Sequence, residues 1–423
     1  MKGKCVNYSV KDISMADSGY KNIEWAEREM KALLKVREEF DSDKPLEGLR
    51  VGMARHITKE TAVLVDTLRT GGADVSICSC NPLSTQDDVA AALADKGVKV
   101  FGYKGETRDE YYEFLRNVIE TDPHITIDDG CDLVSEIHNS YPDMTDTIIG
   151  GCEETTTGII RLRAMEKDNA LKYPIVAVND NMTKHLMDNY YGTGQSTIDG
   201  LLRASNILHA GKTVVVAGYG SCGKGVSMRA RGMGSNVIVT EVDPFRALQA
   251  KMDGFRVMKM EDAACEGDVF ISVTGDKHVI SRETVSRMKD GAICANAGHF
   301  DNEIDMDFCA DEAESVTRIR DSIFDRYTFS SGKTLYIAGE GRLVNLACAE
   351  GHPSQVMSLS FCGQALAVRY LVENRDKLEN GVITLPSEID NRIASLQLEA
   401  LGIEIDTLTG EQKEYLSSWS EGT

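Results

Sequence analysis

Residues 213–243, TVVVAGYGSCGKGVSMRARGMGSNVIVTEVD, decide the fold of the second half of the chain. A β-branched strand leads into a turn with three glycines, and a helix-compatible segment follows. The glycines are Gly218, Gly220 and Gly223. A second strand, residues 236–240, ends at Glu241. This order predicts a βαβ unit of the dinucleotide-binding type, because the glycines allow the tight turn, the approach of a pyrophosphate and the packing of helix on strand.

Glu241 stands about 20 residues beyond the glycine turn, where an acid accepts hydrogen bonds from the adenosine ribose. A carboxylate at this position repels the additional phosphate of NADP, so the predicted cofactor is NAD. A glycine turn alone is common in proteins. The two strands and the terminal acid make the prediction specific.

The composition excludes several partner classes. The chain has 67 acidic and 46 basic residues and a net charge of −21, which disfavours nucleic acid and anionic membrane. None of its 11 cysteines forms a CxxC pair at zinc spacing, so we predict no metal site, and Cys78 and Cys80 are interpreted as packing residues. Residues 1–12 lack an apolar signal core, and no run reaches membrane-spanning length. We expect a cytoplasmic protein with free thiols.

The first half of the chain alternates strand and helix patterns after an amphipathic helix over residues 22–40. The predicted strands are residues 49–53, 74–78, 98–102, 124–129, 147–151 and 174–178, with helices that begin near Thr58, Thr85, Thr107 and Cys131. Such alternation predicts a parallel sheet that is covered on both faces. Polar loops follow the strands, where parallel sheets bind their ligands.

The predicted fold class is therefore α/β, with two doubly wound parallel-sheet domains. A Rossmann-type NAD-binding domain over residues 194–350, with further strands in 269–275, 292–298 and 334–341, is inserted into a substrate-binding domain. That domain comprises residues 1–182 and 352–385, because the apolar helix 354–371 has no strand beside it in the dinucleotide sheet. Residues 386–423 form a small C-terminal segment that we expect to serve oligomerisation.

The connecting stretch 179–200, NDNMTKHLMDNYYGTGQSTIDG, is too polar for a simple buried helix. Lys184 and Asp188 are four residues apart and share one face of a helix. From spacing alone, this pair is interpreted as a surface ion pair.

Several motifs together resemble the S-adenosylhomocysteine hydrolase family along nearly the whole chain. The motifs are HITKETAVLVDTL (56–68), CNPLSTQD (80–87), DDGCDL (128–133), EETTTGIIRL (153–162), VNDNMTKHLMDNYYG (178–192), GYGSCGKG (218–225), NAGHFDNEID (296–305) and GEGRLVNLACAEGHPSQVMSLSF (339–361). The resemblance implies an enzyme that holds NAD and oxidises the ribose 3′-hydroxyl to a ketone. The C4′ proton then becomes acidic, homocysteine leaves, water adds, and the hydride returns, so the net reaction is a hydrolysis.

Carried over to this chain, the resemblance assigns catalytic roles to His56, Asp129, Lys184, Asp188 and His299. Lys184 assists removal of the 3′-hydroxyl proton, which requires a depressed pKa. Asp188 binds the ribose hydroxyls and orients Lys184. His56 and Asp129 are the candidates for C4′ proton abstraction and for acid–base help to sulfur and water, and the sequence does not divide these roles.

The resemblance also implies the binding residues. Substrate-binding residues are Thr58, Glu60, Glu154, Thr155, Lys184, Asp188, His299, His352 and Met357, with Thr58 and Glu60 at the purine edge. Cofactor-binding residues are Thr155, Thr156, Thr157, Asn189, Gly218, Gly220, Ser221, Cys222, Gly223, Glu241, Arg246, Thr274, Asn345 and His352. We expect a homotetramer, as is usual in the family.

The chain also departs from the family pattern. It ends in LSSWSEGT, without the lysine- and tyrosine-bearing tail that reaches the NAD of a neighbouring subunit in many members. Thr193 replaces a common cysteine, Glu350 a common methionine near the purine, and Arg246 a common asparagine. These changes resemble a short-tailed branch in which some members prefer S-inosylhomocysteine.

The predicted function is NAD-dependent, reversible hydrolysis of S-adenosyl-L-homocysteine to adenosine and L-homocysteine in the methyl cycle. The alternative is the same reaction on S-inosyl-L-homocysteine, because Glu60 accepts a hydrogen bond equally well from adenine or from hypoxanthine N1–H. Two further alternatives are a catalytically silent nucleoside-binding protein and an ordinary dehydrogenase. The presence of Lys184, Asp188, His56 and Asp129 disfavours the first, and the nucleoside-type polar loops disfavour the second.

Overall fold

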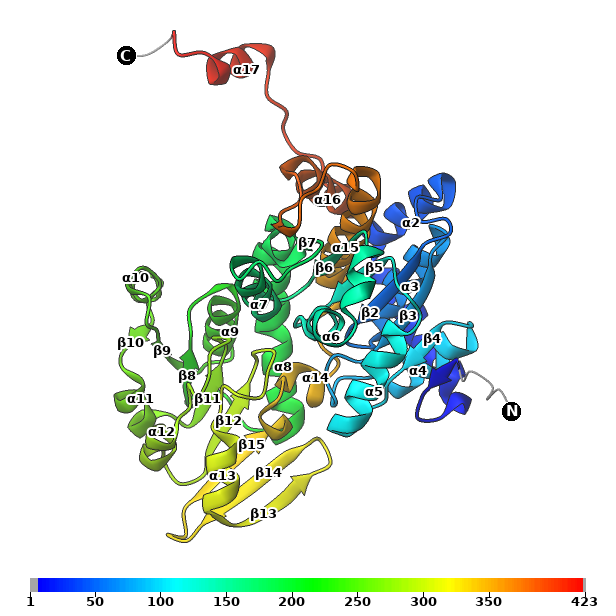
Figure 1. Cartoon of the computed structure of the whole chain (residues 1–423). Coiled ribbons are helices and arrows are strands. Elements are labelled where there is room, and N and C mark those ends of the chain that lie inside the picture. The colour runs from blue at the N-terminus through cyan, green and yellow to red at the C-terminus, as the bar shows by residue number, and fades with distance from the viewer. Residues whose placement is uncertain (1–6, 421–423) are drawn as a thin grey trace, which may run out of the picture.

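The computed structural model describes residues 7–420, and within them two eight-stranded sheets organise the chain (Figure 1). The order of the first sheet is β1-β4-β3-β2-β5-β6-β7-β16, and all of its strand pairs are parallel. Its strands are β1 (Tyr8–Ser9), β2 (Arg50–Ala54), β3 (Asp74–Cys78), β4 (Lys99–Phe101), β5 (Ile125–Asp128), β6 (Gly150–Glu153), β7 (Pro174–Ala177) and β16 (Gly381–Ile383). β16 joins this sheet after the chain has completed the second one.

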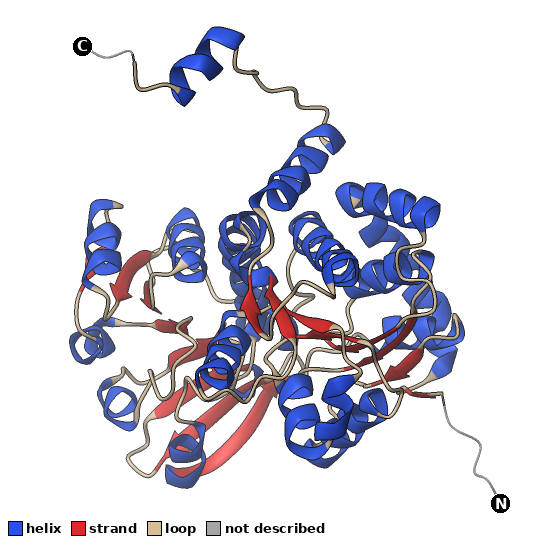
Figure 2. Ribbon diagram, turned by 45° about the horizontal axis from the view of Figure 1, so that its top comes forward, coloured by secondary structure: helices blue, strands red, loops and turns tan. Residues whose placement is uncertain are grey.

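Helices lie on both sides of the first sheet, as expected for parallel strands (Figure 2). They are α1 (Ala16–Glu29), α2 (Lys31–Asp43), α3 (Lys59–Thr70), α4 (Asp87–Asp95), α5 (Arg108–Ile119), α6 (Asp132–Ser140), α7 (Thr156–Lys167), α15 (Ser354–Asn374) and α16 (Ser387–Ala400), with short turns η1 (Ile13–Met15), η2 (Pro142–Asp146) and η3 (Val178–Asp180). The buried helix α15 contacts α2, α3 and β6. It therefore packs on the first sheet although it follows the second in sequence.

The second sheet has the order β10-β9-β8-β11-β12-β15-β14-β13. Its strands are β8 (Thr213–Ala217), β9 (Asn236–Thr240), β10 (Arg256–Val257), β11 (Val269–Ser272), β12 (Ala292–Asn296), β13 (Ala313–Arg320), β14 (Phe324–Phe329) and β15 (Thr334–Ala338). β14 is antiparallel to both β13 and β15. The sheet is therefore not wholly parallel as predicted, because the short turn between β13 and β14 allows only an antiparallel hairpin.

The helices of the second half begin with a π-helix, η4 (Lys184–Gly192), which continues into α8 (Thr193–Ser205). The others are α9 (Ser221–Gly232), α10 (Pro244–Met252), α11 (Met260–Glu266), α12 (Arg282–Arg287), α13 (Met306–Glu312) and α14 (Val344–Ala347), with the short turn η5 (Gly339–Gly341). None of the helices within residues 7–420 is long and apolar enough to cross a membrane.

Local sequence signals place several helix starts correctly. The side chain of Thr58 caps α3, and Thr107 forms a capping box with Glu110 at the start of α5. The single helix predicted over residues 22–40 is wrong, because the chain breaks at Met30 into α1 and α2. The break lets α1 pack on α4 while α2 packs on α15, which a straight helix could not do.

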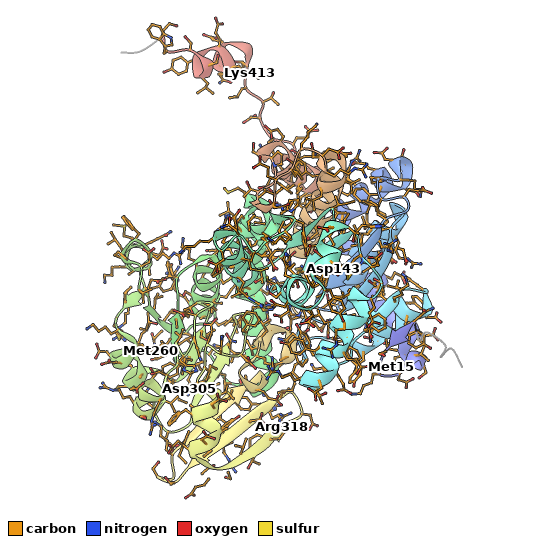
Figure 3. The ribbon with its side chains drawn as sticks, viewed as in Figure 1. Met15, Asp143, Met260, Asp305, Arg318 and Lys413 are labelled. Atoms are coloured by element: carbon orange, nitrogen blue, oxygen red, sulfur yellow. The ribbon has the colours of Figure 1, made fainter. Side chains whose placement is uncertain are left out.

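The C-terminal helix α17 (Gly410–Ser417) stands away from both sheets, and Figure 3 shows Lys413 on it far from the rest of the molecule. Its apolar side chains are exposed: Leu416 is 69% and Trp419 just beyond it 97% accessible. Residues 1–6 and 421–423, at the outer ends of the predicted ranges 1–182 and 386–423, lie outside the described residues.

Candidate active site

A cavity lies between the two sheets and collects residues that follow the carboxyl ends of strands in both. Fifteen of the predicted site residues line it: His56, Thr58, Glu60, Asp129, Glu154, Thr155, Thr156, Lys184, Asp188, Asn189, Cys222, His299, Asn345, His352 and Met357. They come from segments up to three hundred residues apart in the chain. In each sheet the carboxyl ends of the parallel strands lie at one edge, and these two edges meet at the cavity.

Lys184 lies at the centre of a buried charged cluster. Its Nζ is 3.1 Å from Asp188 Oδ1 and 3.6 Å from Glu154 Oε1, and it donates a hydrogen bond to Asn189 Oδ1 at 2.8 Å. The π-helical winding of η4 brings residues four and five positions apart beside one lysine. The pair of Lys184 and Asp188 is buried, with 8% and 0% of the side chains accessible, so its interpretation as a surface ion pair is wrong.

The predicted depression of the Lys184 pKa is also wrong for this arrangement. Burial by itself lowers the pKa, but the charges of Asp188, Glu154 and Asp129 outweigh it and raise the pKa above its ordinary value. Lys184 is therefore an ammonium group in this cluster. It acts by donating hydrogen bonds and by its positive charge.

Asp188 is held as a carboxylate by two groups from a segment distant in sequence. His352 Nδ1 lies 2.8 Å from Asp188 Oδ1, and the hydroxyl of Ser360 donates to Oδ2 at 2.5 Å. Burial would raise the pKa of Asp188, yet the charges of Lys184 and His352 and their hydrogen bonds lower it. His352 also reaches Thr193 Oγ1 at 3.3 Å. Sequence reasoning did not identify Ser360 as part of this network.

Arg55 was missed by sequence reasoning, although among the described residues it carries the only guanidinium within salt-bridge distance of Asp129 and Glu154. Its Nη1 is 3.0 Å from Glu154 Oε2 and 3.6 Å from Asp129 Oδ2, and its side chain is 2% accessible. Gln364 donates to the same Glu154 oxygen at 2.5 Å. The available signal was an arginine just after an apolar predicted strand and directly before His56. An arginine that is buried at such a position is rarely unpaired.

His56 and His299 face Asp129 from opposite sheets. His56 Nε2 is 3.8 Å from Asp129 Oδ2, and His299 Nδ1 is 3.5 Å from Oδ1. Burial, the largest cause, lowers the pKa of His56 to about 3 and lowers that of His299. Burial would raise the pKa of Asp129, but Arg55 and both histidines lower it. Near neutral pH the site therefore presents neutral imidazoles beside an ionised carboxylate.

Cys80 is buried beside His56 and Asp129. The ligand atoms of His56, Cys80 and Asp129 lie within 4.8 Å of one another. Burial raises the pKa of the Cys80 thiol well above its ordinary value, so it is protonated and buried here.

A second charged group lies at the end of the cavity formed by the start of α3. The hydroxyl of Ser354 donates to Glu60 Oε1 at 2.6 Å, and Lys59 Nζ lies 2.8 Å from Glu350 Oε2 and 3.6 Å from Glu60 Oε1. Arg203 from α8 reaches the other oxygen of Glu350 at 3.1 Å. Glu350 thus links α3 of the first sheet to α8 of the second.

The remaining predicted cofactor residues gather around the glycine turn. The backbone of Gly218 turns with φ +103° beside Thr274, and Arg246 lies by Gly220. The Ser221 hydroxyl forms a hydrogen bond of 3.0 Å with His185 Nε2. A Cβ atom at 223 would lie 2.0 Å from Gly218 O, so this glycine is required by the close approach of helix and strand. At Gly220 a Cβ atom would meet only Arg246 Nη1, at 3.7 Å. The open space above Gly220, at the N-terminus of α9, fits a pyrophosphate.

Glu241 is positioned by backbone groups of the same turn. Its Oε2 accepts from Tyr219 N at 2.7 Å, and Oε1 accepts from Val242 N and Asp243 N at 2.7 and 3.1 Å. Oε2, which accepts a single bond, retains a further acceptor site for a ribose hydroxyl, whereas Oε1 already accepts two. Thr157 lies nearby against Gly275.

The open space at Gly220 leads to a prediction. Gly220→Ala introduces a methyl group that the protein itself tolerates, since its backbone has φ −71° and no atom comes closer than 3.7 Å. We expect an unchanged melting temperature and an NAD affinity at least about tenfold weaker, because the methyl group occupies the pyrophosphate position. Calorimetric titration with NAD measures this. Gly232→Ala, at the far end of α9 where nothing lies within 4 Å, is the matched control. Equal NAD affinity in both variants would contradict the assignment.

The comparisons with known proteins agree with the geometry. The family model for the S-adenosyl-L-homocysteine hydrolase NAD binding domain matches residues 189–351, and the model for S-adenosyl-L-homocysteine hydrolase matches residues 7–142. The S-inosyl-L-homocysteine hydrolase of Methanocaldococcus jannaschii is 57% identical over 98% of this chain and 100% of its own length. The adenosylhomocysteinases of Aquifex aeolicus and Sulfolobus acidocaldarius are 55% and 53% identical over 99% of this chain and 100% of theirs. The chain therefore belongs to the S-adenosyl-L-homocysteine hydrolase family and is an NAD-binding enzyme of that family.

Proposed function

We propose that this enzyme catalyses the NAD-dependent, reversible hydrolysis of S-adenosyl-L-homocysteine to adenosine and L-homocysteine. The observation that carries the proposal is the buried cluster of Lys184, Asp188 and Glu154, which lies in one cavity with Asp129 and two neutral histidines. Cys222, the second residue of the cofactor helix α9, lines the same cavity. Ribose-binding groups and the dinucleotide turn are thus adjacent, as an oxidation of the ribose requires.

In this proposal the charged cluster binds the ribose hydroxyls. Bound NAD supplies the hydride acceptor for the 3′ carbon. The Lys184 ammonium stabilises the oxyanion that develops as the hydroxyl proton passes to Asp188 or Glu154, the carboxylates that accept hydrogen bonds from the ribose. This is how a lysine of raised pKa assists the oxidation.

The corner of Asp129, His56 and His299 then handles the protons at C4′ and C5′. Both histidines are neutral near neutral pH, and their ring centroids lie 5.9 Å apart, with each ring near a different oxygen of the carboxylate. One of the three groups removes the C4′ proton, which a 3′ ketone makes acidic, and passes the same proton to the leaving sulfur. It later takes a proton from the attacking water and returns it to C4′. Closure of the two sheets over the cavity excludes bulk water during these steps.

A second candidate substrate is S-inosyl-L-homocysteine. Lys59 lies beside Glu60 at the end of the cavity away from Lys184, and an ammonium there can donate to the six-oxygen of hypoxanthine while Glu60 accepts from N1–H. Adenine offers the reverse pattern, with a six-amino donor for the carboxylates Glu60 and Glu350 that line the cavity. The relative from Methanocaldococcus jannaschii carries the name of the inosine reaction.

The decisive experiment measures thiol release from each thioether at equal concentration, together with the absorbance of reduced nicotinamide on the enzyme. We expect kcat/KM to be at least about tenfold higher for the adenosine compound, which is about 1.4 kcal/mol of transition-state preference. NAD should be consumed in no more than stoichiometric amounts, since it is regenerated in each turnover. A tenfold preference for the inosine compound would transfer the assignment to the second candidate, and no thiol release from either would reject both.

We also propose the domain division stated from the sequence and a cytoplasmic homotetramer. Helix α15 packs on the first sheet, which supports the return of residues 352–385 to the substrate-binding domain. The exposed apolar residues of α17 support a role of residues 386–423 in contact with another copy. Light scattering of the purified enzyme measures the subunit number.

A further inference from the structure

Two carboxyl side chains lie directly behind the catalytic ones. Asp128 ends β5 and Glu153 ends β6, and the two residues are register partners in the sheet. Successive residues of a strand point to opposite faces, so Asp128 and Glu153 leave one face of the sheet together while Asp129 and Glu154 point into the cavity. Asp128 and Glu153 are both fully buried.

The pair holds the backbone of the two loops that carry the catalytic carboxylates. Asp128 uses both of its oxygens as acceptors, whereas Glu153 uses only Oε1. The donors are the backbone N–H groups of Asp129 and Val134 for Asp128 and those of Gly130 and Thr155 for Glu153, each at 2.9 Å. These four hydrogen bonds fix the backbone positions from which the Asp129 and Glu154 side chains extend.

Glu153 has an oxygen that no group satisfies. Its Oε2 is buried and has no hydrogen-bond partner, and its carboxyl group lies so close to Gly158 that a Cβ atom there would be 2.2 Å from it. Within the described residues neither Asp128 nor Glu153 forms a salt bridge. The titratable groups that act on the pair are Asp129, Asp132, Arg161, Cys78, Cys80, Cys131, Cys152 and Tyr173. A buried carboxylate with a free oxygen and no counter-ion costs more than the neutral acid.

We propose that Asp128 and Glu153 are positioning residues that hold the loops of Asp129 and Glu154, with Glu153 as a neutral acid. Burial, followed for Glu153 by the charge of Asp128, raises the pKa of Glu153 well above its usual range, and burial raises that of Asp128 to about 7. The effect on catalysis rests on the proposed function, because that function gives Asp129 and Glu154 their roles.

The different use of their oxygens makes the two residues separable by substitution. Glu153→Ala and Asp128→Ala should each lower kcat for thiol release at least about a hundredfold by loosening the loops. Glu153→Gln keeps one acceptor oxygen and no charge, so it should restore kcat to within about threefold of the wild type. Asp128→Asn should not restore it, because its amide nitrogen would face a backbone N–H group at one of the two positions. A restored kcat in both amide variants, or in neither, would overturn the proposal.

A stability readout tests the protonation of Glu153 without any substrate. A carboxyl group whose pKa is higher in the folded than in the unfolded protein contributes most to the free energy of unfolding below its unfolded pKa of about 4.3. That contribution is lost as the pH rises towards the pKa of the folded state. Glutamine has no such loss. The melting temperature of Glu153→Gln should therefore exceed that of the wild type by a margin that grows from about pH 5 to about pH 8.

The two measurements test the proposed function and the proposal on Glu153 separately. A wild-type enzyme that releases no thiol would reject the proposed function, yet the melting temperatures would still test the pair. A margin that stays constant or shrinks between pH 5 and pH 8 would show that Glu153 is ionised in the folded protein. That result would overturn the proposal while leaving the function intact.

Discussion

Lys184→Ala is expected to lower thiol release by about a thousandfold, within the range that positioned proton-transfer and charge-stabilising groups contribute. The substitution removes the ammonium group that contacts Asp188 at 3.1 Å and Glu154 at 3.6 Å. Without it, no positive charge stabilises the oxyanion of the ribose, so reduction of bound NAD by substrate should disappear as well. Stopped-flow absorbance of reduced nicotinamide, with thiol release in parallel, measures both losses.

Folding must be intact for this result to be informative. Asp188 keeps the contacts of His352 and Ser360 in the variant, so circular dichroism and NAD content should remain close to those of the wild type. Lys172→Ala is the control and should be fully active, because Lys172 is exposed and its ammonium group donates to the backbone carbonyl of Asn169. Full activity in Lys184→Ala would refute the proposed mechanism.

Arg55→Met is expected to destabilise the protein by about 3–5 kcal/mol, because it removes the buried guanidinium that pairs with both Asp129 and Glu154. Methionine preserves the contact with the Phe361 ring but not the charge. The loss should appear as a lower midpoint of urea unfolding at constant m-value.

Arg50→Met is a matched control five residues earlier on β2. Arg50 also pairs with an aspartate, Asp122, at 2.6 Å, but both side chains are accessible, at 32% and 59%. Surface pairs contribute below about 1 kcal/mol, so this variant should unfold at nearly the wild-type midpoint. Adding Glu154→Gln to Arg55→Met should recover part of the loss by removing one uncompensated charge. Equal destabilisation by the two arginine substitutions would show that burial of the Arg55 pair does not matter.

The sequence predicts the parts of the site that depend on local order. The glycine turn before α9 and the caps Thr58 and Thr107 follow from rules that act within a few residues. The family resemblance then named residues that the structure places in one cavity. Lys184 and Asp188 illustrate its limit, because their spacing predicts proximity but says nothing of burial.

The charge state of the cluster could not be predicted from the chain order. Lys184 was expected to have a lowered pKa because burial alone lowers it. The Lys184 pKa is raised instead by the carboxylates of Asp129, Glu154 and Asp188, which follow β5, follow β6 and lie on η4. Only the tertiary structure brings these three carboxylates together. Arg55, Ser360 and Gln364 were missed for the same reason, since each acts on a residue far away in sequence.

The sequence by itself determined the two α/β halves and the NAD turn, because strand alternation, glycine spacing and helix caps are short-range properties. The family resemblance named most residues around the cavity. The tertiary structure decided the break at Met30, the antiparallel hairpin of β13 and β14, the burial of the Lys184 cluster and the pairing of Asp128 with Glu153. These features depend on which surfaces meet after folding. Electrostatic interactions are set by distance in space and by exclusion of water, and neither is encoded by position along the chain.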